Sequence, residues 1–343
     1  MLGRAVLASS PRSVREVTVG DVWEARQRLR PYGRPTPTMS LPETVARRGS
    51  TTVLKLEALS PVGSFKWRGA FNKMLSLPQD LLRGGVTAFS TGNHGIAVAY
   101  AARELGVPAF VCVPATVGRA KLERLRALGA GVDMSAADQD GAAQRCRELQ
   151  EEHSLTLVEP FDDPEVIAGQ GTVGLELLEE HPDLEAVIVP VSGGGLVSGI
   201  AMAIKANSPG TRVIGVGASA AGTMSSSLRA GRPVVVAERA TLADSLLGGL
   251  GPANRYTFDL VQRLGVEMVE VGDDQIADAM RYLLLQAGLA VEGAAAVGIA
   301  ALRSGLVNCG GVVAVVVTGR NVDPTAVSLG EGDAGRAGER RTL

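Results

Sequence analysis

The sequence predicts an α/β protein in which helices flank mostly parallel sheets. From residue 86 onward, apolar segments of strand length alternate with helical segments, and Gly-containing turns separate them. Such alternation is typical of parallel strands joined by crossover helices. The segment 186–191 is apolar on both faces, as expected of a central parallel strand. The composition, 45% hydrophobic and only 3% aromatic over 343 residues, suits packed α/β layers and is long enough for two domains.

The N-terminal part is expected to carry one helix and one strand before the repeating pattern begins. Residues 1–16 are expected to form a tail, and Asp21 is the expected cap of a helix running to about residue 29. The prolines of 31–37 end that helix and favour an extended segment. A strand is predicted over 51–57, and the loop after it carries Lys66.

Three strand, turn and helix units are predicted next, over 86–106, 108–130 and 132–152. The segment 159–172 is expected to be a loop that leads into a helix at 172–180. The remaining predicted elements are strands at 186–191, 212–218, 267–272 and 311–318, and helices after residue 195 and at 273–287. The last strand is expected to close the sheet, and the last dozen or so residues to form a disordered tail.

Charge and cysteine content exclude several classes of partner. A formal charge of −2 with no basic run gives no field for nucleic acid or anionic lipid. Cys112, Cys146 and Cys309 are widely spaced and form no CxxC, which argues against a disulfide framework or a thiolate metal site. No signal h-region and no apolar stretch of about 18 residues is present. A soluble, cytoplasmic protein without a membrane partner is therefore expected.

Lys66 is the first candidate for chemistry. It follows Ser64-Phe65 and opens an apolar helical pattern, an unusual place for a solvated charge. A lysine held out of water loses proton affinity and becomes an amine nucleophile that reacts with carbonyl compounds. The alternative is a surface lysine whose stem covers an apolar helix face.

Ser192-Gly193-Gly194-Gly195-Leu196 lies between a buried strand and a helix. Consecutive glycines let backbone N–H groups approach a phosphate at a helix N-terminus. The spacing is not that of the dinucleotide GxGxxG, because Ser198 occupies the third glycine position. Tight packing of the turn is the alternative explanation.

Two further turns follow predicted strands. Ser90-Thr91-Gly92-Asn93-His94 offers free N–H groups that suit a carboxylate, although Thr91 or Asn93 acting as a helix cap would explain the turn equally well. Thr318 places a hydroxyl at the end of the last buried strand, where ligands gather in open parallel sheets.

Seven segments, in order, resemble those of the pyridoxal-phosphate enzymes of the serine/threonine dehydratase and serine racemase group. They are SFKWRGA, STGNHG, EPFDDPEVIAGQGT, VPVSGGGLVSGIA, LADSLLGGLG, VEGAAAVGIAAL and VTGRNVD. The resemblance implies fold type II, with two sheet domains and the cofactor in the cleft between them. It suggests a large domain of residues 1–84 and 166–328, a small domain of residues 85–165, a tail at 329–343, and a homodimer.

The resemblance also implies roles for individual residues. Lys66 would hold pyridoxal 5'-phosphate and act as the base at the substrate's Cα, Phe65 would pack near the ring, and Asn93 would bind its 3′ oxygen. The residues expected to bind the phosphate are Ser192, Gly193, Gly194, Gly195 and Leu196. Thr318 would face the pyridine nitrogen, and a neutral hydroxyl there favours β-elimination over a long-lived carbanion.

The resemblance also implies which residues bind the substrate, and some positions depart from the family's pattern. The residues expected to bind substrate are Ser90, Thr91, Gly92, Asn93, His94 and Asp244, with Arg255 a further residue of interest. Thr91 replaces the serine that acts as second base in racemases, which puts racemisation in doubt. Gly217 and Thr223 replace the carboxylates of metal-dependent members, so no metal is expected there.

The implied activity is a lyase that eliminates water and ammonia from a hydroxylated substrate. The segments around Asp244 and Glu292 most resemble hydroxyectoine-utilisation dehydratases, which favours a hydroxylated solute or amino acid in that degradation. A threonine/serine dehydratase that yields a keto acid and ammonia is the alternative. A racemase, a β-replacement enzyme and a non-catalytic phosphate-binding protein remain open.

Overall fold

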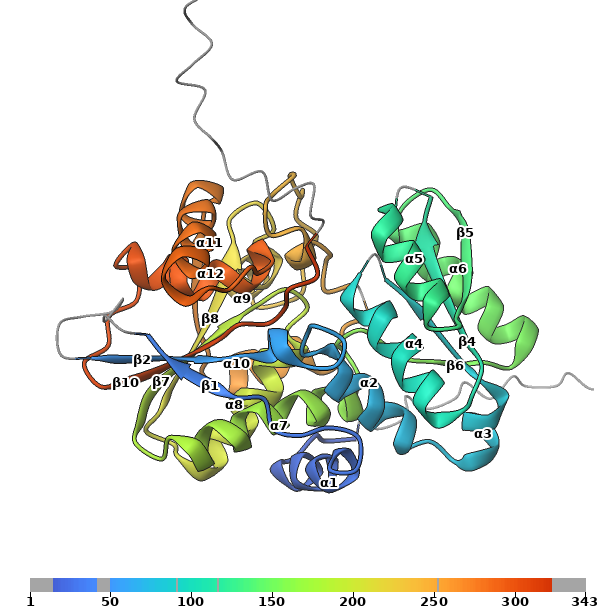
Figure 1. Cartoon of the computed structure of the whole chain (residues 1–343), viewed down its shortest axis with the longest axis horizontal. Helices are drawn as coiled ribbons and strands as arrows, with labels where there is room; N and C mark the ends of the chain where they lie inside the picture. The colour runs from blue at the N-terminus through green and yellow to red at the C-terminus, as the bar shows by residue number, and fades with distance from the viewer. Residues whose placement is uncertain (1–14, 42–49, 91, 116, 252, 323–343) are drawn as a thin grey trace, which may run out of the picture.

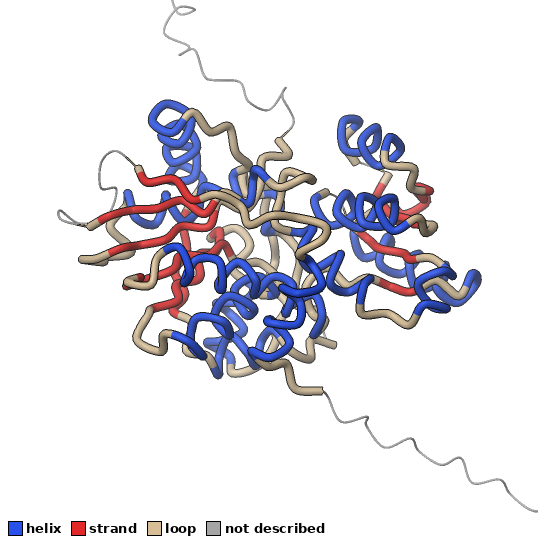
Figure 2. Tube along the Cα trace, turned by 60° about the horizontal axis from the view of Figure 1, so that its bottom comes forward, coloured by secondary structure: helices blue, strands red, loops and turns tan. Residues whose placement is uncertain are grey.

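The computed structural model describes residues 15–41, 50–90, 92–115, 117–251 and 253–322. Within them, two sheets with helices on both faces lie side by side (Figures 1 and 2). The fold class predicted from the sequence is confirmed. The predicted tails at 1–16 and 329–343 fall almost entirely outside the described residues.

The larger sheet has six strands in the order β1-β2-β10-β7-β8-β9. Its strands are β1 (Thr38–Ser40), β2 (Thr51–Lys55), β7 (Leu184–Pro190), β8 (Arg212–Ala218), β9 (Glu267–Val271) and β10 (Val312–Val316). Only the β1–β2 pair is antiparallel within this sheet of the described chain. The last strand therefore does not close the sheet at an edge, because β10 lies between β2 and β7.

Alternating residues of β10 show how the larger sheet is covered on both faces. Val313 and Val315 pack in one apolar cluster with helices α11 (Asp273–Ala287) and α12 (Gly293–Arg303). Ala314 and Val316 point to the other face, where α7 (Pro164–Glu180) and α8 (Gly195–Asn207) pack. The remaining helices that pack around this sheet are α1 (Val19–Leu29), α9 (Thr223–Ala230) and α10 (Thr257–Arg263), with short 3₁₀ turns η1 (Glu57–Leu59) and η2 (Asp244–Leu246).

The smaller sheet has four parallel strands in the order β5-β4-β3-β6. They are β3 (Val86–Phe89), β4 (Ala109–Pro114), β5 (Gly131–Ala136) and β6 (Thr156–Leu157). The helices near it are α2 (Lys66–Leu75), α3 (Gln79–Gly84), α4 (Asn93–Leu105), α5 (Arg119–Ala127) and α6 (Gln139–His153). Helix α2 shares an apolar cluster with β3, β4 and α4, and it also packs against α7. The helix that begins at Lys66 therefore joins both halves, and the exact domain boundaries stay a prediction.

Two helix starts differ from the sequence expectation. Helix α7 begins at Pro164, so most of the expected loop 159–172 is helical, because the Asp163 carboxylate accepts from two N–H groups of the first turn. Helix α1 is capped by Thr18 rather than Asp21; Asp21 is the third helical residue and completes a capping box. The predicted helix at 273–287 is confirmed as α11.

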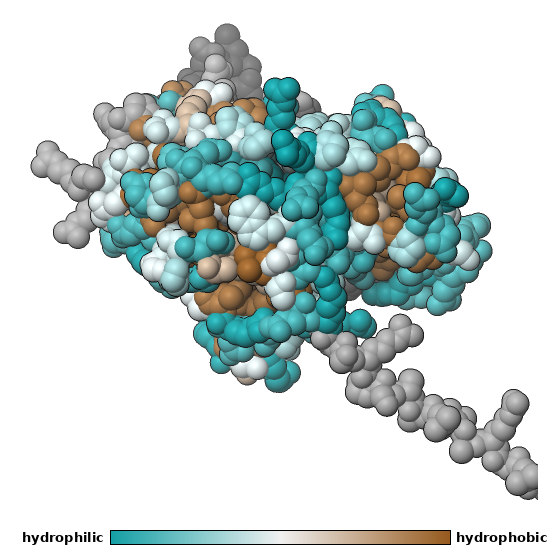
Figure 3. Space-filling model, turned by 90° about the horizontal axis from the view of Figure 1, so that it is seen from below, coloured by the Kyte–Doolittle hydropathy of each residue, from teal (hydrophilic) through white to brown (hydrophobic). Residues whose placement is uncertain are grey.

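The surface seen from the side of α1 is mostly hydrophilic, with apolar patches between polar regions (Figure 3). Trp23 on α1 is 42% exposed. All three cysteines are buried and free. No helix in the described part of the chain is long and apolar enough to cross a membrane.

Candidate active site

Lys66 lies at the junction of the two sheets. The residues before it are tied to the end of β10: the Phe65 N–H donates to the Thr318 carbonyl at 3.0 Å, and Ser64 forms an isolated bridge with Gly319. The Lys66 Nζ donates to the Pro160 carbonyl at 2.7 Å. The segment that leads into Lys66 therefore lies beside Thr318, another predicted site residue, although the two are far apart in sequence.

The Lys66 amine is removed from water although part of the side chain remains accessible. Burial lowers the pKa of Lys66 from 10.5 to about 8. The amine also lies 5.2 Å from the centroid of the Phe65 ring. A lysine with this pKa supplies a substantial neutral fraction near neutral pH, which a surface lysine does not. The structure thus favours a nucleophilic lysine over a solvated one.

The glycine-rich turn follows β7 and leads into α8. Gly194 has φ +89°, a conformation that glycine adopts without strain. The first helical hydrogen bond runs from the Ser198 N–H to the Gly194 carbonyl, so the N–H groups of Gly195 and Leu196 precede it and have no partner within the helix. These N–H groups at the positive end of α8 suit an anion.

Phe161 connects the glycine turn to Lys66. A Cβ atom placed on Gly193 would lie 2.4 Å from the Phe161 ring, so only glycine permits this approach. Phe161 follows Pro160, whose carbonyl accepts from Lys66. The structure therefore brings together two predicted site segments, 64–66 and 192–196, on either side of residues 160–161. No sequence signal singled out the Pro160 carbonyl.

The start of α4, where the sequence predicts a carboxylate site, also presents N–H groups that precede the helical hydrogen bonds. The Ser90 Oγ accepts from the Gly92 N–H at 3.0 Å, and the first helical bond runs from Ile96 to the Gly92 carbonyl. The N–H groups of Asn93 and His94 thus precede the helical hydrogen bonds. Thr91, the candidate second base, lies outside the described residues.

His94 is a neutral, enclosed side chain of this turn. Its Nε2 lies 2.8 Å from the Val158 carbonyl, and because a carbonyl only accepts, Nε2 carries the hydrogen. Burial, together with the charge of Lys66, lowers the pKa of His94 to about 3. Its Nδ1 is buried without a hydrogen-bond partner in the described chain. His94 therefore braces the turn and offers an unused acceptor.

Glu292 organises a polar network that sequence reasoning did not assign to the site. Its carboxylate accepts from Asn93 Nδ2 at 2.9 and 3.0 Å, from the Asn321 N–H at 2.8 Å and from Ser245 Oγ at 2.9 Å. Asn321 Nδ2 in turn donates to Asn93 Oδ1 at 2.6 Å. A Cβ on Gly319 would lie 2.3 Å from the Glu292 carboxylate. Glu292 could have been found in the sequence, because it is a carboxylate directly before a helix of small residues.

Asp244 and Arg255 lie nearer the surface. The Asp244 side chain is 61% exposed and its carboxylate is 3.6 Å from Lys121 Nζ. Arg255 is exposed, and its backbone N–H donates to Asp162 at 2.6 Å. The structure places Asp244 at the edge of the site and assigns Arg255 no side-chain role there.

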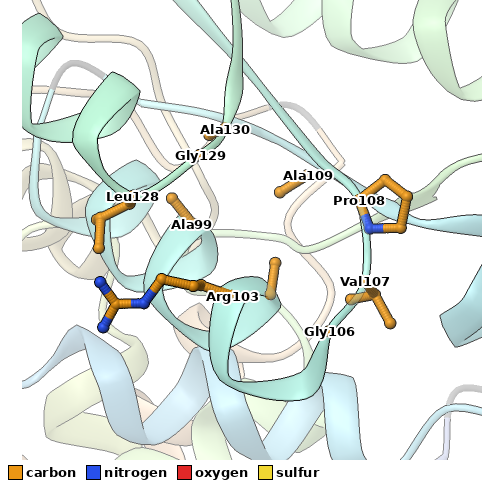
Figure 4. A pocket seen from close by; sticks show the side chains of 10 residues that line it. Ala99, Arg103, Gly106, Val107, Pro108, Ala109, Leu128, Gly129 and Ala130 are labelled. Atoms are coloured by element: carbon orange, nitrogen blue, oxygen red, sulfur yellow. The ribbon is translucent and has the colours of Figure 1, made fainter.

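A surface depression of about 320 Å³ is not part of this site. It is lined by the end of α4, the start of β4 and the end of α5, including Arg103 and Leu128 (Figure 4). Residues that start β4 lie at the opposite end of the smaller sheet from the turn that follows β3. Among the described residues, no cluster of three or more His, Cys, Asp or Glu side chains could hold a metal ion.

Fold and site together define a class: α/β proteins with two sheets, a lysine of lowered pKa between them, and N–H groups without helical partners at the starts of α4 and α8. These features fit a small ligand that carries both a carbonyl and a phosphate.

Comparisons with known proteins name the family. The family model described as "Pyridoxal-phosphate dependent enzyme" matches residues 29–319. A putative threonine dehydratase of Sinorhizobium fredii is 43% identical over 90% of this chain and 93% of its own length. An L-threonine ammonia-lyase of Thermotoga maritima is 41% identical over 90% and 76% of the two chains. The solved structure of maize serine racemase matches with a TM-score of 0.85 at 33% identity, covering 90% and 95%. The chain belongs to the pyridoxal-phosphate dependent enzyme family, and it is a lyase of that family.

The residues present fit this cofactor. The Lys66 amine suits its aldehyde, and the N–H groups at the start of α8 suit its phosphate. Thr318 is buried beside the backbone that carries Lys66 and supplies a neutral hydroxyl. When bound, pyridoxal phosphate supplies an aldehyde for amines and an electron-withdrawing ring.

Proposed function

We propose that this chain catalyses β-elimination from a hydroxylated amino acid, L-threonine or L-serine, giving 2-oxobutanoate or pyruvate and ammonia. The observation that carries the proposal is Lys66, whose pKa burial lowers to about 8, held on the Pro160 carbonyl next to Phe161, which packs against the glycine turn. The substrate class is supported by the threonine and serine names of relatives that match about nine tenths of the chain.

Lys66 is the proposed base. Its Nζ, when neutral, takes the proton from the substrate's Cα, and burial keeps a neutral fraction available near pH 8. The Pro160 carbonyl accepts from Nζ and so orients the amine. Phe65 packs beside it and excludes water from one side.

Substrate and cofactor binding are divided between two helix starts. The N–H groups of Asn93 and His94 at the start of α4 are the proposed carboxylate site. The residues proposed for the phosphate are Ser192, Gly193, Gly194, Gly195 and Leu196. Asn93 is the proposed partner of the cofactor's 3′ oxygen, and Glu292 with Asn321 fixes its amide.

The identity of the substrate, the type of reaction and the oligomeric state belong to the same proposal. Hydroxyectoine, suggested by two sequence segments, is a second candidate substrate that product analysis separates from threonine and serine. A D-isomer as product would indicate a racemase, and a substituted product with a second nucleophile would indicate β-replacement. A homodimer in the cytoplasm is the expected form.

Lys66→Ala tests the central proposal. We expect the variant to lose turnover of L-threonine by a factor of about 10³ or more, because the base and the cofactor's anchor are removed together. Keto-acid release measures turnover, and the visible absorption of the protein after gel filtration measures retained cofactor. Lys205→Ala is the matched control, because Lys205 only donates to carbonyls at the end of α8. Turnover retained in Lys66→Ala would contradict the mechanism.

A further inference from the structure

Lys121, which the site described above does not use, reaches from α5 over the start of α4. A Cβ atom placed on Gly92 would lie 3.5 Å from Lys121 Nζ and 3.7 Å from its Cε. The lysine stem therefore runs along the backbone of the turn that leads into α4. Its ammonium stands close to the N–H groups that begin this helix.

The charge partner of Lys121 is loosely held. Lys121 Nζ and Asp244 Oδ2 are 3.6 Å apart, and the two side chains are 28% and 61% exposed. Exposed pairs with this separation contribute little to stability, because solvent competes for both charges. The ammonium is therefore free to exchange Asp244 for another anion at small cost.

The pair also spans the two halves of the molecule. Helix α5 packs against α4 and β5 of the smaller sheet, whereas η2, which carries Asp244, packs against α12 of the larger one. The next residue, Ser245, donates to the Glu292 carboxylate, which also accepts from Asn93. Lys121 thus stands beside the proposed substrate position, where both halves meet.

Two sources of positive potential converge at this point: the N–H groups at the start of the 13-residue helix α4, which are the positive end of its dipole, and the Lys121 ammonium. A single carboxylate of a ligand would contact both. The geometry points to Lys121 as a specificity-determining residue that binds the substrate's carboxylate, with Asp244 holding the ammonium in place until substrate arrives. This inference rests on the proposed lyase function and deepens it.

Kinetics of Lys121→Met provide the first test. The KM for L-threonine should rise about tenfold with kcat changed by less than about threefold, because the charge stabilises bound substrate and transition state alike. Arg119→Met on the same helix is the matched control, since the Arg119 side chain is 91% exposed and pairs with Glu123. Its KM should match that of the wild type. Lys121→Arg should recover most of the lost affinity.

A binding measurement tests the inference without turnover. α-Methyl-L-serine lacks the Cα hydrogen that the reaction removes, and its amide lacks the carboxylate. Calorimetric titration of the holoenzyme should show Lys121→Met weakening the acid about tenfold and leaving the amide within about twofold. Asp244→Asn should bind the acid as tightly as the wild type or up to about threefold more tightly, because the competing carboxylate is gone.

Equal affinity of wild type and Lys121→Met for the acid, or equal weakening of acid and amide, would overturn the role of Lys121. Failure of the proposed function has a different signature, because wild-type protein would then release no keto acid from threonine or serine. The titration with acid and amide still decides the role of Lys121 in that case, since it needs no reaction.

Discussion

At the scale of single residues, His94 and Lys66 show how burial sets protonation in the site. Neither has a carboxylate partner to stabilise its charge, so loss of solvation lowers the pKa of both, to about 3 and about 8. The proposed roles of both side chains depend on their neutral forms. A neutral Lys66 accepts a proton, and a neutral His94 keeps its Nε2 hydrogen on the Val158 carbonyl.

The free energy of unfolding should record the titration of His94. Its pKa is about 3 in the folded protein, against 6.5 for a solvated imidazole, so the unfolded chain binds more protons between these values. Stability is therefore fully present above pH 6.5 and falls as pH decreases, by at most about 1.4 kcal/mol per pH unit. In His94→Gln this contribution should vanish, and denaturant unfolding between about pH 6.5 and 4.5 should show a shallower loss. Parallel pH profiles of the two proteins would refute the buried neutral state.

At the scale of elements, two turns carry the site because each leads from a parallel strand into a helix. β3 leads into α4, and β7 leads into α8. The carboxyl ends of parallel strands thus place both helix N-termini at the edge where open α/β sheets bind ligands. The glycine turn requires glycine at two positions for different reasons. Gly194 has a positive φ, and at Gly193 a side chain would collide with the Phe161 ring.

Comparing Gly194→Ala with Gly231→Ala separates the effect of packing at this turn from that of backbone strain. A Cβ there would lie 2.7 Å from Met224 Cε and 3.0 Å from Thr257 Cβ. Gly231 also has a positive φ, +66°, but a Cβ there meets no atom within 4 Å. Gly231→Ala should cost only about 1 kcal/mol of stability, from the backbone. Gly194→Ala should cost more and weaken pyridoxal phosphate binding about tenfold or more, because the turn must move.

Denaturant unfolding of the cofactor-free proteins and absorption titration with pyridoxal phosphate measure the two effects. The same cofactor affinity in both glycine variants would mean that the turn does not hold the phosphate.

At the scale of the whole molecule, a buried charge network holds the helix that starts at Lys66. Arg68 is 1% exposed and donates to Glu57 at 2.8 and 2.9 Å and to Glu176 at 2.5 and 2.8 Å. Lys55 Nζ lies 2.9 Å from Glu176. Burial alone would raise the pKa of Glu176, but the charges of Arg68 and Lys55 outweigh it and lower that pKa. The network joins α2 to α7 and to the segment that follows β2.

Replacing one residue of the network should show how much the network contributes to the free energy of unfolding. Arg68→Met should lower the free energy of unfolding by about 3–5 kcal/mol at pH 7, because buried Glu57 loses its cationic partner and Glu176 loses one of its two. The Glu176 contribution is present above its ordinary pKa of 4.5 and is lost as pH falls, so the difference from wild type should shrink toward about pH 4.

Arg303→Met, at the partly exposed Arg303–Asp278 pair, is the control and should change stability by at most about 1 kcal/mol. Denaturant unfolding at about pH 7 and at several pH values below the ordinary pKa of 4.5 measures both. An effect of Arg68→Met no larger than that of Arg303→Met would show that the buried network is dispensable.

The amino-acid sequence alone was enough to predict the α/β class and most of the strands, and it singled out Lys66 and the two strand-to-helix turns as candidates for the site. These features depend on local patterns: apolar periodicity, a small-residue turn after a strand, and a lysine that opens an apolar helix. The start of α7 was also within reach of the sequence, because Asp163-Pro164 is a helix-start signal, but the glycines that follow resemble a loop.

The residues that surround Lys66 and Asn93 could be identified only from the folded chain. Asn93 and Glu292 are 199 residues apart in sequence, and Lys66 and Pro160 are 94 apart. The Pro160 carbonyl has no side-chain signature, and Glu292, Asn321 and Lys121 acquire their roles only from the partners that folding brings to them. The position of β10 between β2 and β7 also depends on contacts between segments that are far apart in sequence. Local pattern specifies each element, whereas contacts between distant elements specify strand order and the environment of Lys66.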